Sequence, residues 1–403
     1  MPNETLSGGA SELARHWSID PDVVYLNHGS FGACPIPVLE AQRRLRDRME
    51  RQLVTFFVRD LEPLLDEARA ALAAFVGADA RDLAFVSNTT AGVNAVVRSL
   101  AFGPGDEILT TNHAYGACRN ALEFVARQSG ARVVVAEVPF PIAFPERVVE
   151  AVLARATPRT RLAMIDHVTS PTALVFPIER IVAALAARGI DTLIDGSHAP
   201  GMLALDVPAI GAAYYTGHCH KWLCAPKGAA FLWVRRDRQD RVHPTTISHG
   251  AASARTDRSR FHMSFDWPGT IDPTAWLCVP ESIRFFGSIV PGGWDEVRRR
   301  NRAMALAARR TLCDALEIPL PAPDAMIGSI ATVPIPDGAP GPTAGPLSIE
   351  PLQGALYERY RIEVPMWDWP ASPKRILRVS AQLYNDASQY ERLAAALRKI
   401  LGE

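Results

Sequence analysis

Two segments of this chain place a carboxylate, a histidine and a lysine at a spacing that suits one kind of chemistry. The run DTLIDGSHAPG carries Asp195 and His198 directly after a short apolar stretch, and YYTGHCHKWLCAPKG carries Lys221 about two dozen positions later. A lysine amine forms a Schiff base with an aldehyde, and a carboxylate keeps a pyridine nitrogen protonated so that the ring accepts electrons. The segments therefore predict a site for a pyridine-aldehyde cofactor.

The scarcity of lysine supports the choice of Lys221. The chain has 43 Lys and Arg residues, of which only four are lysines: Lys221, Lys227, Lys374 and Lys399. Arginine cannot form that Schiff base at ordinary pH. Lys221 lies among aromatic and apolar residues, and burial there would lower its pKa and make it a nucleophile. The alternative is a lysine that extends from a strand edge into water.

Asp195 and His198 also have ordinary structural explanations. An Asp before Gly196 commonly caps a turn, and a lone histidine is commonly a loop residue. A carboxylate at the end of a buried strand is costly unless it is paired. We interpret Asp195 as the partner of the ring nitrogen, with His198 near the ring, because Lys221 follows.

A phosphate site is predicted at SNTTAG, residues 87–92, where an apolar run changes to a helical pattern. Free N–H groups and the helix dipole favour an anion at such a tip, and the side chains of Asn88, Thr89 and Thr90 add polar atoms. Simple capping of the helix by Asn88 or Thr89 would give the same pattern.

Two weaker signals complete the set of candidates. HAYGA, residues 113–117, offers the flat rings of His113 and Tyr115 to cover a cofactor face, or else a buried tyrosine and a surface histidine. RILRVSAQLYN places Arg378 on a strand, where it could bind a substrate carboxylate or simply face water.

Strand-like and helix-like runs alternate from residue 83 to about residue 234, and the strands are apolar throughout. This pattern predicts an α/β fold with a mostly parallel, seven-stranded-type sheet covered on both faces. Ligands bind beyond the carboxyl ends of such strands, so residues 87–92, 111–116 and 195–201 should share one site. We expect an N-terminal arm (1–24), a large domain (25–280) and a smaller C-terminal α/β domain (281–403) packed with the arm.

Composition indicates an ordinary globular protein. The 403 residues are 48% hydrophobic and carry a formal net charge of zero, which argues against nucleic-acid and membrane-surface partners. The six cysteines lack paired spacing, and we predict reduced thiols, no metal site and a cytoplasmic location. No signal peptide or membrane span is expected. No GxGxxG follows the early strands, which argues against a dinucleotide-binding enzyme.

With these motifs in hand, the chain resembles a fold-type I enzyme dependent on pyridoxal 5'-phosphate (PLP), in the class V aminotransferase family and its isopenicillin N epimerase-like branch. The resemblance runs from about Tyr25 to the C-terminal helix. It rests on seven segments: YLNHGSFGACP, FVSNTTAGVNAVV, IDHVTSPTALVFPI, IDGSHAPG, GHCHKWLCAPKG, WPGTIDP and LRVSAQLYN.

The resemblance implies a role for each candidate. Lys221 would form the Schiff base and shuttle the Cα proton, Asp195 would pair with the pyridinium, and Arg378 would hold the substrate carboxylate. His113 aligns with the residue that stacks on the ring, with Tyr115 a close competitor. The remaining cofactor contacts would come from Asn88, Thr89, Thr90, Thr169, Ser170, His198, His218 and His220. Asn27 and Ser30 would border the substrate. Gly269 and Thr270 would reach the phosphate of a partner subunit, which implies a homodimer with shared sites.

The implied activity is proton removal at the Cα of an amino acid, followed by epimerisation or by expulsion of a β-substituent in a C–S lyase. Transamination is a third possibility within the family. Related cysteine desulfurases carry a loop cysteine shortly before the arginine, and residues 360–377 contain none. We therefore expect neither a desulfurase nor a non-catalytic module, and the aromatic MWDW segment, residues 366–369, suggests a bulky or apolar substrate portion.

Overall fold

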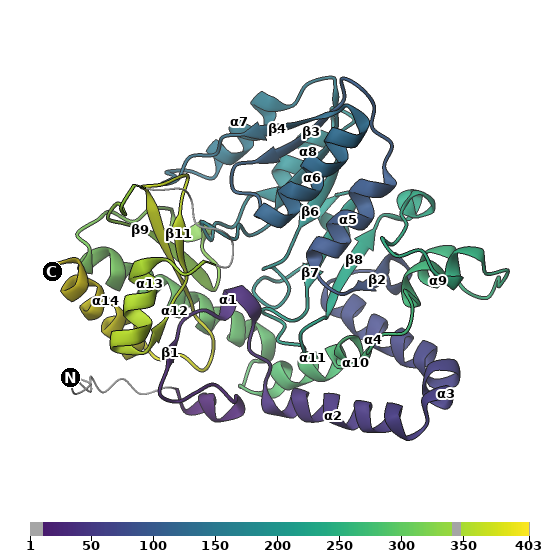
Figure 1. Ribbon diagram of the computed structural model, residues 1–403, viewed down its shortest axis with the longest axis horizontal. Coiled ribbons are helices and arrows are strands. Elements are labelled where there is room, and N and C mark those ends of the chain that lie inside the picture. Colours follow the sequence, from purple (N-terminus) through teal and green to yellow (C-terminus); the bar gives the residue numbers. More distant parts are fainter. Residues whose placement is uncertain (1–10, 341–347, 403) are drawn as a thin grey trace.

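The computed structural model describes residues 11–340 and 348–402, so the first ten residues of the expected arm lie outside the described part. Its largest element is a seven-stranded sheet in the order β2-β8-β7-β6-β5-β3-β4 (Figure 1). All its neighbours pair in parallel except β8, which is antiparallel to β2 and β7. The predicted mostly parallel sheet is thus confirmed. The strands are β2 Leu83–Val86, β3 Glu107–Thr111, β4 Arg132–Ala136, β5 Thr160–Asp166, β6 Asp191–Asp195, β7 Tyr214–His218 and β8 Ala230–Val234.

Helices cover both faces of this sheet because alternate strand residues bury on opposite sides. Ile165 and Ile194 face a cluster that includes α4, α7 and α8, whereas Met164 and Leu193 face a cluster that includes α5, α6 and α9. The helices of the large body are α4 Leu61–Phe75, α5 Thr89–Ser99, α6 Gly116–Ser129, α7 Glu146–Arg155, α8 Ile178–Ala186 and α9 Arg260–Asp266. The N-terminal segment adds α1 His28–Phe31, α2 Ile36–Arg51 and α3 Leu53–Thr55.

A smaller antiparallel sheet, ordered β11-β12-β9, forms the C-terminal part. Its strands are β9 Ile330–Ile335, β11 Met366–Asp368 and β12 Arg375–Ser380. The arm joins this part, because β1 Val24–Tyr25 pairs in parallel with β10 Ile362–Glu363. The helices here are α12 Gly293–Ala315, α13 Pro351–Tyr360 and α14 Ala387–Leu401, whereas α10 Thr274–Leu277 and α11 Val279–Ser288 pack against α2 and α4.

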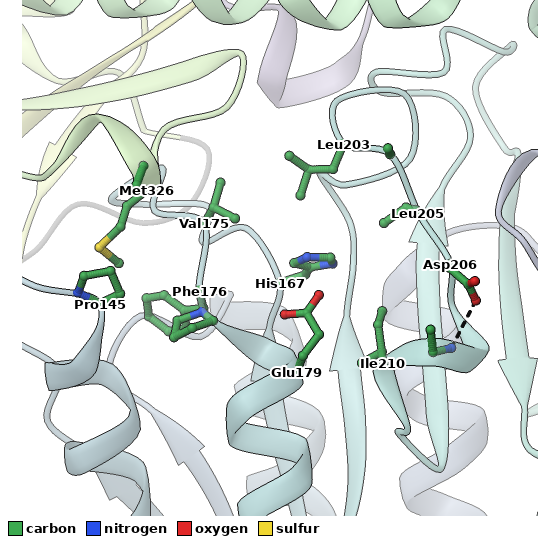
Figure 2. Close-up of a pocket in the computed structure, with 14 residues that line it drawn as sticks. Pro145, His167, Val175, Phe176, Glu179, Leu203, Leu205, Asp206, Ile210 and Met326 are labelled. Atoms are coloured by element: carbon green, nitrogen blue, oxygen red, sulfur yellow. Dashed lines mark hydrogen bonds between the residues drawn. The ribbon is translucent and has the colours of Figure 1, made fainter.

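A cavity of about 540 Å³ lies where the large sheet meets the C-terminal part. Figure 2 shows His167, from the end of β5, opposite Leu203 and Met326 at its wall. None of the candidate residues from the sequence lines this cavity. It is therefore separate from the predicted site, although Nδ1 of His167 lies 3.0 Å from the Tyr215 hydroxyl on β7.

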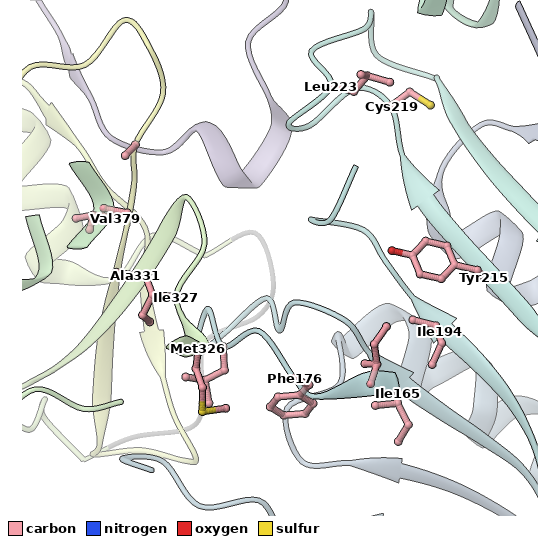
Figure 3. Close-up of a cluster of buried hydrophobic side chains, with 14 of the residues drawn as sticks. Ile165, Phe176, Ile194, Tyr215, Cys219, Leu223, Met326, Ile327, Ala331 and Val379 are labelled. Atoms are coloured by element: carbon pink, nitrogen blue, oxygen red, sulfur yellow. The ribbon is translucent and has the colours of Figure 1, made fainter. Parts of the chain in front are cut away.

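One apolar cluster connects the two sheets. Ile165 and Ile194 from the large sheet belong to the same cluster as Ala331 and Val379 from the small one, with Phe176 between them (Figure 3). This shared core fixes the position of the large sheet relative to the small sheet. Candidate residues lie on or beside strands of both sheets. Within residues 11–340 and 348–402, no helix combines the length and the apolar character needed to cross a bilayer.

Candidate active site

Lys221 follows β7, and its amine contacts a histidine. Nζ is 3.3 Å from Nε2 of His198, whose Nδ1 is 3.3 Å from Nε1 of Trp222. An indole nitrogen only donates, so Nδ1 of His198 accepts and the neutral imidazole carries its hydrogen on Nε2. The contact with Lys221 is therefore favourable only for an unprotonated amine, whose lone pair accepts.

The surroundings favour that neutral amine. Burial and the charge of Arg378 lower the pKa of Lys221 to about 7, against the opposing effect of Asp195. Burial, helped by the charges of Lys221 and Arg378, holds the pKa of His198 well below its usual value. A substantial fraction of Lys221 is thus a nucleophile at neutral pH.

Asp195 ends β6 and is 1% exposed. One carboxylate oxygen accepts hydrogen bonds from the N–H of Ser197 at 2.9 Å and from its hydroxyl at 2.5 Å. The thiol of Cys118 lies 3.3 Å from the other oxygen. No basic side chain within the described ranges forms an ion pair with Asp195. A buried carboxylate without a cation suits a positively charged ring nitrogen.

Asp166 is a second carboxyl beside Asp195 that sequence reasoning missed. The two residues pair in register at the ends of β5 and β6. Burial and the neighbouring charge of Asp195 raise the pKa of Asp166 well above its usual value, which disfavours its charged form. The signal was present as the repeated ID dipeptide at two adjacent strand ends, residues 165–166 and 194–195.

The predicted anion tip lies at the start of α5. Asn88 caps the helix, because its side-chain oxygen accepts a hydrogen bond from the N–H of Ala91 at 2.8 Å. The N–H of Thr89 donates to Nε2 of His218 at 3.0 Å, so a neutral His218 carries its hydrogen on Nδ1. Neither that Nδ1 nor the Thr89 hydroxyl has a hydrogen-bond partner among the residues described. The tip therefore offers two unused polar groups to an anion.

His220 extends this tip. Its ring lies 4.3 Å from that of His218 between centroids, and its Nδ1 lies 2.9 Å from the main-chain oxygen of Ala229. Burial lowers the pKa of His220 to about 4, so the ring is neutral. Thr90 lies in the first turn of α5, and its main-chain oxygen accepts a hydrogen bond from Asn94.

Arg378, on β12, is 2% exposed and forms no ion pair with any residue that the structure describes. One guanidinium nitrogen donates to the main-chain oxygen of Ser170 at 2.6 Å and to its hydroxyl at 3.2 Å, and another donates to Ser30 at 3.1 Å. The guanidinium lies 5.1 Å from the centre of the Trp367 ring, and its Nε has no hydrogen-bond partner in the described ranges. Burial lowers the pKa of Arg378 to about 10, so it stays charged at neutral pH.

Asn27 and Ser30 join Arg378 in one hydrogen-bonded chain. The Ser30 hydroxyl donates to the side-chain oxygen of Asn27 at 2.5 Å, and the amide of Asn27 reaches Glu363 at 3.5 Å. The structure thus brings the three predicted substrate residues together.

The two aromatic candidates for stacking differ in accessibility. His113 is 0% exposed, with Nδ1 at 2.6 Å from the Thr172 hydroxyl and Nε2 at 2.9 Å from the main-chain oxygen of Val138. Tyr115 is 47% exposed, and the charges of Asp195 and Arg378 both act on its hydroxyl. Only the Tyr115 ring is open to a ligand. The stacking role of His113 that the resemblance implies stays a prediction.

Three further candidates lie apart from this group. Thr169 is fully buried, and its hydroxyl is 2.8 Å from that of Thr172 and accepts from the N–H of Leu174. Gly269 and Thr270 lie on the segment between α9 and α10, and a Cβ built on Gly269 would meet no atom within 4 Å. Their predicted contact with a partner subunit stays a prediction.

Comparison with known proteins agrees with this arrangement. The family model "Aminotransferase class-V" matches residues 48–345. An isopenicillin N epimerase of Amycolatopsis lactamdurans is 37% identical over 397 residues, covering 95% of this chain and 96% of that protein. The chain belongs to the class-V aminotransferase family. The predicted family and its isopenicillin N epimerase-like relatives are confirmed, and this membership makes the chain a PLP-dependent enzyme.

Two further comparisons concern a relative with a different printed activity and a solved structure with the same fold. An L-cysteine desulfhydrase of Arabidopsis thaliana is 28% identical over 421 residues, covering 97% of this chain and 90% of that protein. The apo structure of a cysteine desulfurase from Thermococcus onnurineus NA1 superimposes with a TM-score of 0.80 at 18% identity, covering 99% of this chain and 100% of that one. The second similarity confirms the predicted fold.

The residues of this site fit PLP, because several of their buried charged and polar groups lack an ion pair or a hydrogen-bond partner among the residues described. Within residues 11–340 and 348–402, neither Asp195 nor Arg378 forms an ion pair, although both are buried. In the same ranges the Thr89 hydroxyl and His218 Nδ1 have no hydrogen-bond partner at a helix N-terminus. A phosphorylated, protonated pyridine together with a substrate carboxylate would complement each of these groups. Sequence reasoning did not identify Ser197, because it is defined only by what it contacts, and it named Trp367 only as part of the aromatic MWDW segment.

Proposed function

We propose that Lys221 binds the aldehyde carbon of PLP covalently, that Asp195 pairs with the ring nitrogen, and that the α5 tip holds the phosphate. The unpaired Thr89 hydroxyl and the Nδ1 hydrogen of His218 support the last assignment. When bound, PLP supplies an aldehyde that joins to amines and a protonated ring that draws electron density from Cα. The accessible ring of Tyr115 is the better candidate to cover the cofactor face, in place of His113.

We further propose that the enzyme epimerises the Cα of an amino-acid substrate whose carboxylate binds Arg378. The observation that carries this proposal is a buried, charged Arg378 that contacts neutral oxygens and an aromatic face and forms no ion pair with any residue that the structure describes. A carboxylate held there would lie near Lys221, because the charge of Arg378 acts directly on that amine. Lys221 Nζ, with a pKa of about 7, can take the Cα proton and return it.

Epimerisation also needs a proton delivered to the opposite face of Cα. Tyr115 is half-exposed, and burial of the rest of the side chain raises the pKa of its hydroxyl, so it remains protonated. It can therefore donate a proton and lies within electrostatic reach of Asp195 and Arg378. The similarity to an epimerase that is 37% identical supports epimerisation as the activity.

The test is proton exchange in heavy water with a panel of D- and L-amino acids and their peptide-linked derivatives. Epimerisation predicts deuterium at Cα and appearance of the other stereoisomer, without a keto acid. If no substrate in the panel exchanges its Cα proton, and no keto acid forms, the proposal fails for these substrate classes.

A C–S lyase is the second candidate, favoured by the similarity to an L-cysteine desulfhydrase. With cysteine it would yield pyruvate, ammonia and sulfide in equal amounts. The same heavy-water reactions separate the two candidates, because only elimination releases sulfide. Transamination would give a keto acid without sulfide. Residues 360–377 contain no cysteine, which supports our expectation that persulfide transfer is not the activity.

We also propose a homodimer in a cytoplasmic setting. Gly269 and Thr270 lie on a segment whose glycine has open space around it, as a contact to a second subunit would need. Sedimentation of the loaded enzyme, compared with a Thr270→Trp variant, tests this. A wild-type monomer with full PLP occupancy would contradict the shared-site proposal.

A further inference from the structure

The short helix α1 contacts both the segment that carries Lys221 and the side chain of Arg378. Nε2 of His28 is 3.0 Å from the main-chain oxygen of Lys221, and the hydroxyl of Ser30 accepts from Arg378 at 3.1 Å. Between them, the N–H of Gly29 donates to the hydroxyl of Ser380, on the same strand as Arg378, at 2.9 Å. In Figure 1, α1 lies between the large sheet and the small C-terminal sheet.

The hydrogen positions on His28 follow from its partners. A main-chain oxygen only accepts, so Nε2 of His28 carries the hydrogen and donates to Lys221. Nδ1 therefore accepts, and the Tyr384 hydroxyl at 2.9 Å donates to it. The imidazole thus has one defined tautomer, with both nitrogens in use.

The protonation state of His28 is fixed as well. The groups facing it are the Tyr384 hydroxyl, the Cys224 thiol and the charges of Lys221 and Lys227. Burial, reinforced by the two lysine charges, lowers the pKa of His28 to about 3. The hydrogen bond to Lys221 therefore persists over the whole working pH range.

The segment around α1 has little freedom to move. His28 is 0% exposed, and its ring centroid is 4.8 Å from that of Trp222. Gly32, just after the helix, has φ +70°, and a Cβ there would lie 2.0 Å from the main-chain oxygen of His220. Lys227 donates to the main-chain oxygen of Gly32 at 2.6 Å. The helix is thus held tightly against the segment that carries Lys221.

We propose that helix α1 fixes the position of the Lys221 amine relative to the Arg378 guanidinium, and we call this helix with its contacts the bracket. His28 is then the positioning residue that contacts Lys221. A carboxylate that binds Arg378 would offset the positive charge that acts on the Lys221 amine, and the contacts through Ser30, Gly29 and His28 would fix the separation over which that charge acts. This inference rests on the proposed roles of Lys221 and Arg378. It adds a physical route from the substrate carboxylate to the reactive nitrogen.

The test uses the PLP-loaded enzyme and the pH midpoint of its visible absorbance, with and without saturating propionate as an unreactive carboxylate. In wild type, propionate should shift the midpoint. His28→Leu should move the resting midpoint by roughly half a pH unit or more and reduce the shift with propionate. His28→Gln, which can still donate to the Lys221 oxygen, should restore much of both. Ser30→Ala should keep the resting midpoint and reduce the propionate shift.

The chain offers a matched control for a merely structural histidine. His262 is also buried, and its Nε2 is 3.1 Å from the main-chain oxygen of Leu83, on the large sheet. His262→Leu should lower the melting temperature without moving the midpoint. If His28→Leu and His262→Leu behave alike in the absorbance titration, or if Ser30→Ala keeps the full propionate shift, the bracket is refuted. An error in the proposed role of Lys221 is a separate outcome, because the visible absorbance would then be unchanged in Lys221→Ala.

Discussion

The Lys221 end and the Arg378 end of the site both bury a basic side chain, but their surroundings differ. Lys221 contacts a neutral histidine, and burial with the charge of Arg378 lowers its pKa to about 7. Arg378 is surrounded by serine oxygens and the Trp367 ring, and its pKa falls only to about 10. At pH 8 the lysine is therefore largely neutral and the arginine is charged.

This difference indicates a division of labour. A neutral amine can attack a carbonyl carbon and accept a proton, whereas a permanently charged guanidinium can only bind and orient. The arginine charge also lowers the lysine pKa, so the binding group activates the reacting group. Variants at the two ends should accordingly affect different kinetic constants.

The largest effect is expected at the reactive amine. Lys221→Ala should abolish the visible absorbance of covalently held cofactor and lower kcat by about 10⁴-fold or more, because nucleophile and base are lost together. The measurement combines absorbance spectra with Cα proton exchange.

Lys227 provides the control for that experiment. Its amine donates to the main-chain oxygen of Gly32, which is a structural role. Lys227→Ala should keep the absorbance. If Lys221→Ala retained the absorbance and Lys227→Ala lost it, the assignment of the reactive lysine would be wrong.

A smaller loss is expected from Asp195→Asn, which keeps the shape of the side chain but removes its charge. The variant should retain cofactor and lose about 10²- to 10³-fold in kcat, because the ring nitrogen is no longer held protonated. Asp166→Asn is the matched control, since burial and the charge of Asp195 raise the pKa of Asp166 and disfavour a second charge beside Asp195. Equal losses in the two variants would show that the charge of Asp195 is not the feature that matters.

At the other end, Arg378→Lys should raise KM by roughly 10- to 100-fold with a smaller change in kcat, because the paired donors to the carboxylate are lost. A drop in kcat at unchanged KM would contradict the division of labour.

The electrostatic link between the two ends can be measured separately. In Arg378→Leu apoprotein, the pKa of Lys221 should rise above 7, because a positive neighbour that disfavoured its protonated form is gone. The rate at which added PLP becomes covalently attached should then reach its plateau at higher pH than in wild type. A pH profile identical to that of wild type would show that burial alone sets the lysine pKa.

The sequence predicted the mostly parallel sheet, which the structure confirms, and it singled out Lys221 as the candidate reactive lysine, because both leave local signals. Apolar strand runs end in polar tips, and Lys221 is one of only four lysines. It could not choose between His113 and Tyr115, because burial and hydrogen-bond partners decide between them and both depend on segments distant in the chain. Arg378 raised the same difficulty. The chain has many arginines, and nothing in the sequence distinguishes one that lies on a strand. The structure distinguishes Arg378, because it is buried and forms no ion pair with the residues described.

The smallest expected effect concerns Tyr115. Tyr115→Ala should weaken PLP retention by roughly 2- to 12-fold, the usual range for one aromatic contact, whereas Tyr115→Phe should retain PLP normally. If the hydroxyl also delivers a proton, Tyr115→Phe should slow epimerisation more than Cα proton exchange, because exchange needs only Lys221. His113→Ala should lower thermal stability, since its ring is fully buried and hydrogen-bonded at both nitrogens. Weaker PLP retention in His113→Ala than in Tyr115→Ala would instead favour His113 as the residue that covers the ring.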